Sequence, residues 1–167
     1  MTNIRRYFRS NETAFLTSVT YKRLPILIDN FELLRDSFKH HLFRINAELV
    51  AWVVLPDHFH MLLSSNGDDI SNLMRKIKLS FSSQYRKSMQ LKSGRIWQYR
   101  YWDHIIRNQN DYNRHIDYIH YNPVKHGYVS SPIDWGHSSF REFLNEGYYS
   151  EGWGVKEGLN FDGEFDE

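Results

Sequence analysis

The chain has 167 residues, which fits one domain with a substantial core, and it contains no cysteine. Disulfide bonds and thiolate zinc sites are therefore excluded, and any metal ion must be bound by histidine, carboxylate, amide or water. The formal net charge is +1 and no apolar run approaches the roughly 20 residues of a membrane helix, so we expect a cytoplasmic protein that is neither secreted nor inserted into a membrane.

The first half of the chain predicts three strands and one helix. Residues 13–21 are rich in Phe, Val, Thr and Tyr, which is typical of a strand. Asp29 and Glu32 resemble a capping box, and the apolar residues that follow recur at helical spacing. Residues 48–55 are almost wholly apolar, as expected of a central strand. Residues 58–64 come soon after a Pro-Asp turn, so we expect the last two strands to pair as an antiparallel hairpin.

The middle of the chain predicts a second helix and a fourth strand. Ser71 can cap this helix, whose apolar stripe consists of Met74, Ile77, Phe81 and Tyr85. The sequence Lys-Ser-Gly at residues 92–94 is expected to break it. Residues 95–107 are aromatic and predicted to be partly extended, with the strand centred on residues 104–106.

A last helix is predicted over residues 111–122, where Pro123 is expected to stop it. The order strand, helix, strand, strand, helix, strand matches the ferredoxin-like, split β-α-β arrangement. We therefore expect an α+β fold with an antiparallel sheet, two helices on one face and the last helix near the other, otherwise free face. Residues 1–145 are expected to form the folded domain, followed by an acidic tail over residues 146–167.

The charges are sorted along the chain. Residues 70–101 contain eight basic residues and no acidic one, whereas from Glu142 to the end eight acids stand against Lys156 alone. This distribution predicts a polyanionic partner that binds the basic residues. The acidic tail can compete with that partner for the same residues. The alternative is that the basic residues form a solvated helix face. The basic residues that we expect to contact this partner are Arg5, Arg6, Lys22, Arg23, Arg75, Lys76, Lys78, Arg95 and Arg100.

Aromatic residues alternate with some of these basic residues. In proteins that bind single-stranded nucleic acid, such side chains stack on unpaired nucleobases, and the alternative is that they pack in the core. The residues in question are Trp97, Tyr99, Tyr101 and Trp102.

His58 and His60 are separated by one residue on a predicted strand. Their side chains therefore leave the same face and can bind one cation, while Phe59 and Met61 point toward the opposite face. With nine histidines in the chain, the alternative is a pair of hydrogen-bonded or surface imidazoles.

The predicted helix over residues 111–122 carries a second set of polar side chains. Its core-facing stripe is Tyr112, Ile116 and Ile119, and Tyr118, Asn122 and His115 are expected to lie on a flank away from that core. A phenol beside a cation can attack a backbone phosphorus and form a covalent phosphotyrosine. Since the chain has eleven tyrosines, the alternative for Tyr118 is a packing role.

Three motifs together resemble the REP-associated tyrosine transposases, which are single-tyrosine members of the His-hydrophobic-His nucleases. They are His-Phe-His after an apolar strand, Trp-Gln-Tyr-Arg-Tyr-Trp-Asp-His at 97–104, and Asp-Tyr-Ile-His-Tyr-Asn-Pro-Val-Lys-His-Gly at 117–127. The similarity extends from about residue 5 to about residue 140. The segment that ends in Asn-Pro-Val is much more specific than the His-Phe-His spacing.

The resemblance implies a catalytic domain with a ferredoxin-like fold that nicks and rejoins DNA. By this mapping Tyr118 is the nucleophile, and His58, His60 and Asn122 bind a divalent ion, Mg²⁺ or Mn²⁺. Related insertion-sequence transposases carry Gln at the position of Asn122. The implied substrate is single-stranded DNA folded into hairpins of repetitive extragenic palindromes, cut to leave a 5′-phosphotyrosine. No nucleotide cofactor is implied, and the protein acts as a monomer or a homodimer.

Two other functions fit the same residues. A non-catalytic ferredoxin-like protein can bind single-stranded nucleic acid through its sheet, without dependence on a divalent ion. A replication-initiation nickase uses the same chemistry as a transposase. Asp57 and His104 are further residues that can approach the metal or a water, with a turn residue and a sheet residue as the alternatives.

Overall fold

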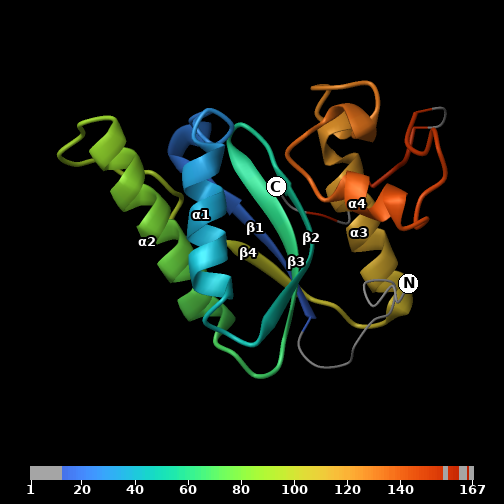
Figure 1. Cartoon of the computed structure of the whole chain (residues 1–167), viewed down its shortest axis with the longest axis horizontal. Helices are drawn as coiled ribbons and strands as arrows, with labels where there is room; N and C mark the ends of the chain where they lie inside the picture. Colours follow the sequence, from blue (N-terminus) through green and yellow to red (C-terminus); the bar gives the residue numbers. More distant parts are fainter. Residues whose placement is uncertain (1–12, 156–157, 162–164, 166–167) are drawn as a thin grey trace.

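The structure of the protein is a computed structural model that describes residues 13–155, 158–161 and 165 (Figure 1). Short 3-10 turns occur at Tyr21–Arg23 and Pro132–Asp134. The main elements are β1 (Thr13–Val19), α1 (Phe31–Leu42), β2 (Ala47–Val54), β3 (His58–Ser65), α2 (Ile70–Ser88), β4 (Trp102–Ile105), α3 (Gln109–Lys125) and α4 (Phe140–Asn145).

The four strands form one antiparallel sheet in the order β2-β3-β1-β4. The two β-α-β halves are therefore interleaved, with β3 of the second half beside β1 of the first, which confirms the ferredoxin-like, split β-α-β prediction. Helices α1 and α2 cover one face of the sheet, and α3 lies against the other (Figure 1). The predicted strand over residues 95–107 is interrupted: Trp102–Ile105 forms a strand beside β1, and Trp97 makes only an isolated bridge to Thr20.

Strand β3 divides its side chains between two cores, as its alternating sequence predicts. Phe59 and Met61 belong to the core under α1 and α2. Leu62 belongs to a second core, which packs against α3 together with Phe15 of β1. The second face of the sheet is covered by α3, as predicted for the last helix, and in addition by aromatic residues from the end of the chain, so the otherwise free face that was expected beside α3 is occupied.

This cover corrects the prediction that one flank of the last helix points away from the core. Tyr118 and Asn122 are 0% exposed and His115 is 4% exposed, so all three are buried. The physical reason is that α3 lies across the sheet with neighbours on two sides. Its Ile116 stripe is in the same core as Phe161, which comes from the predicted tail.

The helix ends differ from three sequence predictions. Helix α1 begins after Asn30, whose side chain makes no capping hydrogen bond, so the expected capping box does not form. Helix α2 is capped by the carboxylate of Asp69, which accepts from the backbone of Asn72, and not by Ser71.

Pro123 lies inside α3 and does not stop it. The helix continues to Lys125, because Gly127 provides the end at a φ of 75°. The backbone N–H of Gly127 donates to Val124, and that of Tyr128 donates to Pro123, which is the Schellman pattern of a glycine-terminated helix.

Residues after α3 complete the fold. The buried imidazole of His120 is hydrogen-bonded on both nitrogens, with Tyr149 Oη and Ser139 Oγ each at 2.8 Å. Tyr149 is buried although it follows the predicted domain boundary at residue 145, which stays a prediction. Residues 137–139 run along the outer edge of β2, where Val54 N donates to His137 O and Ser139 N donates to Trp52 O.

In the part of the chain that the structure describes, the helices are all too short or too polar to cross a bilayer.

Candidate active site

His58 and His60 lie on β3 and point toward α3. They are 1% and 0% exposed, and their ring centroids are 5.0 Å apart in an edge-to-face arrangement. The predicted shared face of the pair is therefore present. Burial lowers the pKa of His60 well below its usual value, and the charges of His58, His126, Lys125 and Arg23 lower it further.

Each imidazole of this pair has a hydrogen-bonding partner at Nδ1. His58 Nδ1 donates to Asp57 Oδ1 at 2.6 Å, and His60 Nδ1 lies 2.6 Å from Thr17 Oγ1 on the neighbouring strand. Asp57 also accepts from Arg23 at 3.1 Å. Burial raises the pKa of the Asp57 carboxyl, but the hydrogen bond and the charge from His58 and Arg23 outweigh this and bring the pKa to about 2.

In the ring of His58 the contact with Asp57 leaves Nε2 as the second nitrogen. His58 Nε2 is buried and has no hydrogen-bond partner among the described residues. A buried nitrogen in this state is costly unless a ligand satisfies it. Asp57 is thus more than a turn residue, because it orients His58.

Tyr118 of α3 packs directly on the histidine pair. Its ring centroid is 5.3 Å from that of His60 and 5.9 Å from that of Phe15. Lys125 Nζ lies 3.5 Å from Tyr118 Oη, at the outer limit for a hydrogen bond. An ammonium group at this position favours negative charge on the phenol oxygen.

Two further residues of the α3 C-terminus border the pair. Asn122, one turn beyond Tyr118, is 0% exposed. The ring of His126, which caps α3, is 5.1 Å from that of His58. Burial lowers the pKa of His126 to about 4, and the positive charges of His58 and Lys125 act in the same direction.

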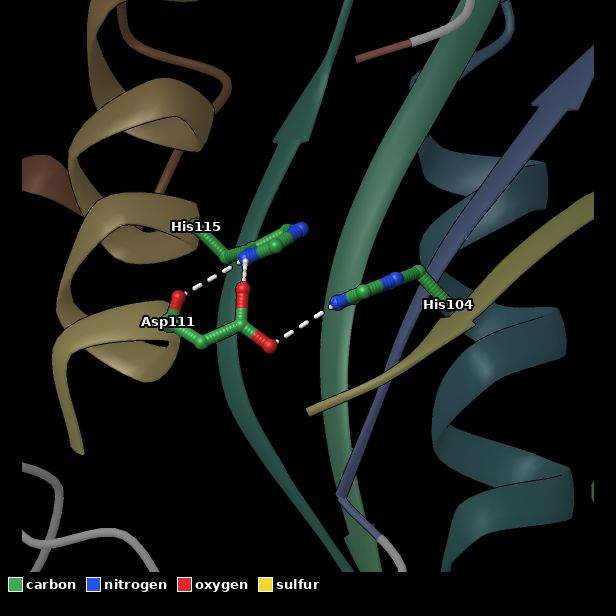
Figure 2. Close-up of side chains that lie close together, drawn as sticks. All are labelled: His104, Asp111 and His115. Carbon is green, nitrogen blue, oxygen red and sulfur yellow. Dashed lines mark hydrogen bonds and ion pairs between the residues drawn. The ribbon is translucent and has the colours of Figure 1, made fainter. Parts of the chain in front are cut away.

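A second polar group lies nearer the start of α3 (Figure 2). Asp111 Oδ2 accepts from His104 Nε2 of β4 at 2.9 Å, and His115 Nδ1 lies 3.2 Å from Asp111 Oδ1 and 2.8 Å from the Asp111 carbonyl. The ligand atoms of these three residues lie within 4.8 Å of one another, which is the spacing of a metal-binding group. His104 is therefore not at the His58–His60 pair but in this separate group.

The C-terminal segment covers Tyr118. The ring of Phe165 stacks on the ring of Tyr118 with centroids 4.0 Å apart and an interplanar angle of 8°. Phe161 contacts the same ring edge-to-face at 5.4 Å. The phenol therefore lies under two aromatic side chains in this structure.

The basic residues that were predicted to contact DNA are spread over several surfaces. Arg75, Lys78 and Arg95 line one cavity of about 310 Å³. Arg100 lines a second cavity of about 430 Å³, whereas Lys76 lines a third, on another side of α2. Lys22 and Arg23 occupy the Tyr21–Arg23 turn near Asp57, and Arg5 and Arg6 lie outside the described residues.

The predicted aromatic platform is divided between surface and core. Tyr99 is 82% exposed and its ring carries the guanidinium of Arg95 at 3.5 Å from the centroid. Trp97 is 6% exposed and packs in the core under α1 and α2. The stacking interpretation therefore fits Tyr99, and the core interpretation fits Trp97.

Sequence reasoning did not select several of these neighbours. Thr17 and Lys125 were missed, and the second polar group was not seen as a unit. The signal for Thr17 is its register opposite His60, which is set by strand pairing and is not visible in the local sequence. The signal for Lys125 and His126 was present, because both stand in the motif that follows Asn-Pro-Val.

Comparison with known proteins places this chain in one class of enzymes, the tyrosine transposases. Residues 13–122 match the family described as "Transposase IS200 like", and the chain belongs to this family. The matched region contains His58, His60 and Tyr118, and its last residue is Asn122.

The individual relatives agree with this assignment. The chain is 38% identical to a REP-associated tyrosine transposase of Escherichia coli K12, over 92% of this chain and 91% of the relative. A Haemophilus influenzae relative with the same family name is 35% identical, over 98% of this chain and 99% of the relative. The solved structure of a REP-associated tyrosine transposase bound to a REP hairpin has a TM-score of 0.79, with 36% identity over 97% of this chain and 96% of the other.

Proposed function

We propose that this transposase nicks and rejoins single-stranded DNA that folds into hairpins, through a covalent 5′-phosphotyrosine on Tyr118. The observation that carries the proposal is the packing of the Tyr118 ring 5.3 Å from His60, which is itself 5.0 Å from His58. The hairpin substrate is supported by the relative that was solved with a REP hairpin.

In the proposed reaction the Tyr118 oxygen attacks a backbone phosphorus. The P–O bond to the 3′ oxygen breaks, the phenol loses its proton, and the leaving oxygen takes up a proton to become a free 3′-hydroxyl. Lys125, 3.5 Å from the phenol oxygen, stabilises its charge before attack. Rejoining is the reverse attack by a 3′-hydroxyl, so the phosphodiester energy is kept in the phosphotyrosine and no nucleotide is consumed.

We further propose that His58, His60 and Asn122 bind a divalent ion, Mg²⁺ or Mn²⁺. The buried His58 Nε2, which has no hydrogen-bond partner among the described residues, fits a ligand atom. The Nδ1 partners Asp57 and Thr17 hold the two rings with Nε2 toward α3. When bound, such an ion supplies Lewis-acid polarisation of a phosphate oxygen.

The hydroxyl of Thr17 gives a test of this orientation. Thr17→Val keeps the side-chain shape but removes the contact with His60 Nδ1, and we expect the Mn²⁺ concentration for half-maximal nicking to rise about 10-fold or more. The matched control is Thr13→Val on the same face of β1, where the hydroxyl contacts Ser64 instead. Equal Mn²⁺ dependence of the two variants would contradict the positioning role of Thr17.

The cavities beside the pair suggest the path of the DNA strand. The cavity that contains Arg100 is also lined by Thr17, the partner of His60, and it shares Gln98 and Tyr101 with the cavity that contains Arg95. A strand that leaves the active site can therefore pass Arg100 and reach the Arg95–Tyr99 stack, where a base can rest on an exposed aromatic ring.

Arg95→Gln tests this path. We expect weaker binding of single-stranded hairpin DNA, and a slope of log K against log salt that is smaller by about one, because one phosphate contact is lost. Fluorescence anisotropy at several salt concentrations measures both quantities. The control is Arg35→Gln on α1, where the guanidinium is ion-paired with Glu32. If the Arg35 variant loses as much affinity as the Arg95 variant, the path is wrong.

The proposal as a whole is tested by incubating the protein with labelled hairpin DNA and Mn²⁺ or Mg²⁺. A labelled protein band on a denaturing gel, mapped by peptide sequencing to Tyr118, is the expected result. Salt-sensitive binding without any adduct would instead favour the non-catalytic nucleic-acid binder.

A further inference from the structure

The group His104, Asp111 and His115 joins strand β4 of the sheet to the start of helix α3. His104 belongs to β4, an edge strand, and Asp111 and His115 occupy successive turns at the start of α3. Figure 2 shows the Asp111 carboxylate between the two imidazoles. The group is partly buried: the side chains are 21%, 17% and 5% exposed, in the same order.

The donor set fits a borderline divalent metal ion. Two imidazoles and one carboxylate offer ligand atoms within 4.8 Å of one another. Each imidazole directs one nitrogen toward a different oxygen of the same carboxylate, at 2.9 Å and 3.2 Å. His115 Nδ1 also lies 2.8 Å from the Asp111 carbonyl oxygen, so a cation bound by these three residues would replace hydrogen bonds that are present in this structure. Nitrogen-rich sets of this kind select Zn²⁺ or Co²⁺ over Mg²⁺.

A second observation makes this group more than a pair of hydrogen bonds. The His115 side chain is 5% exposed, and its Nε2 is buried with no hydrogen-bond partner among the described residues. Its ring stacks on that of His104 with centroids 4.8 Å apart and an interplanar angle of 10°. This unsatisfied nitrogen is not the ligand atom, which is Nδ1, so a cation is supported by the 4.8 Å spacing of the ligand atoms and by the parallel stacking of the two rings beside one carboxylate.

This group is separate from the His58–His60 pair. The ring of Phe15 stands between the two, stacked on His60 at 5.3 Å on one side and 4.8 Å from the ring of His115 on the other. A single ion therefore cannot bridge the two groups.

We propose that His104, Asp111 and His115 form a second metal site, for Zn²⁺ or a similar borderline cation, that cross-links β4 to the start of α3. The site has a structural role: it fixes the first turns of the helix whose later turns carry Tyr118. It does not depend on the proposed DNA chemistry.

Cobalt titration of the full chain tests the site, because Co²⁺ bound by nitrogen ligands has visible absorption bands. The His58→Gln/His60→Gln variant removes the other histidine pair, and we expect it to retain one equivalent of Co²⁺, displaced by Zn²⁺. Adding Asp111→Asn and His115→Gln should abolish this equivalent. The matched control adds His40→Gln and His41→Gln, which removes another histidine pair on α1 and should leave the equivalent intact.

Wild-type protein gives an independent measurement that requires no variant to fold. In ¹⁵N spectra of the imidazoles, diamagnetic Zn²⁺ is expected to shift the coordinating nitrogens of His104 and His115 in addition to any effect at His58 and His60. At a hundredfold excess over its Kd, Zn²⁺ is expected to raise the unfolding midpoint by about 5 to 10 °C. Shifts confined to His58 and His60, or a cobalt equivalent that survives Asp111→Asn/His115→Gln, would overturn the second site.

Discussion

A Tyr118→Phe variant is expected to bind hairpin DNA as tightly as the wild type and to form adduct and nicked product slower by a factor on the order of 10³ or more. The substitution removes only the attacking oxygen. The ring keeps its contacts with His60 and Phe165, so the fold and the surrounding surface stay in place. Binding is measured by fluorescence anisotropy, and nicking by gel assay at saturating protein.

The same helix offers a matched control for this variant. Tyr112 is also buried on α3, at 2% exposure, and it lies six residues before Tyr118. Tyr112→Phe therefore removes a tyrosine hydroxyl from the same helix but not the proposed nucleophile. We expect Tyr112→Phe to nick at close to the wild-type rate. If Tyr118→Phe and the wild type nick equally well, another residue is the nucleophile and the proposed mechanism is wrong.

Phe165→Ala is expected to accelerate adduct formation about 3- to 10-fold. In this structure the Phe165 ring stacks on Tyr118 at 4.0 Å, so we expect it to restrict the approach of a DNA phosphate to the phenol. An aromatic pair contributes about 0.5–1.5 kcal/mol beyond its buried area, and removing it shifts the population toward the open state. Single-turnover adduct formation at saturating hairpin DNA measures the effect.

Phe43→Ala is the control for this variant, because Phe43 is 91% exposed and lies on the far side of the sheet, at the end of α1. An adduct rate for Phe165→Ala that is unchanged or lower would mean that the segment does not restrict access. The contact between the described part of the tail and Tyr118 is aromatic, while most of the tail acids lie outside the described residues, so competition by their charge stays a prediction.

The sheet could be predicted from sequence because its signals are local. The alternation around Phe59 and Met61 requires only the period of a strand, and it placed His58 and His60 correctly on the opposite face. The stripe of α2 was equally accessible, since Ile77 and Phe81 recur at the helical period and are both buried.

The helix ends were less predictable, because several residues compete for each position. Asp69, not Ser71, caps α2, and Gly127, not Pro123, ends α3. Proline at position 123 removes one donor from the helix, but it does not force the chain to leave the helix when a glycine with positive φ stands four residues later.

The surroundings of Tyr118 could not be predicted from the period of its own helix. Its burial depends on Phe161 and Phe165, which come from a segment without periodicity. The His104–Asp111 contact likewise depends on how β4 meets α3 in three dimensions. Basic residues that are adjacent in sequence can also lie on different surfaces. Arg75 and Lys76 line different cavities, because neighbouring side chains on a helix point about 100° apart.

The segment that runs along β2 has a consequence for self-association. An edge strand presents unpaired backbone N–H and C=O groups that can pair with a strand of a second molecule, and such pairing leads to dimers or to aggregates. Here Trp52 and Val54 already exchange backbone hydrogen bonds with residues 137–139. A second copy of this protein can therefore pair with the Trp52–Val54 end of β2 only if that segment first moves away.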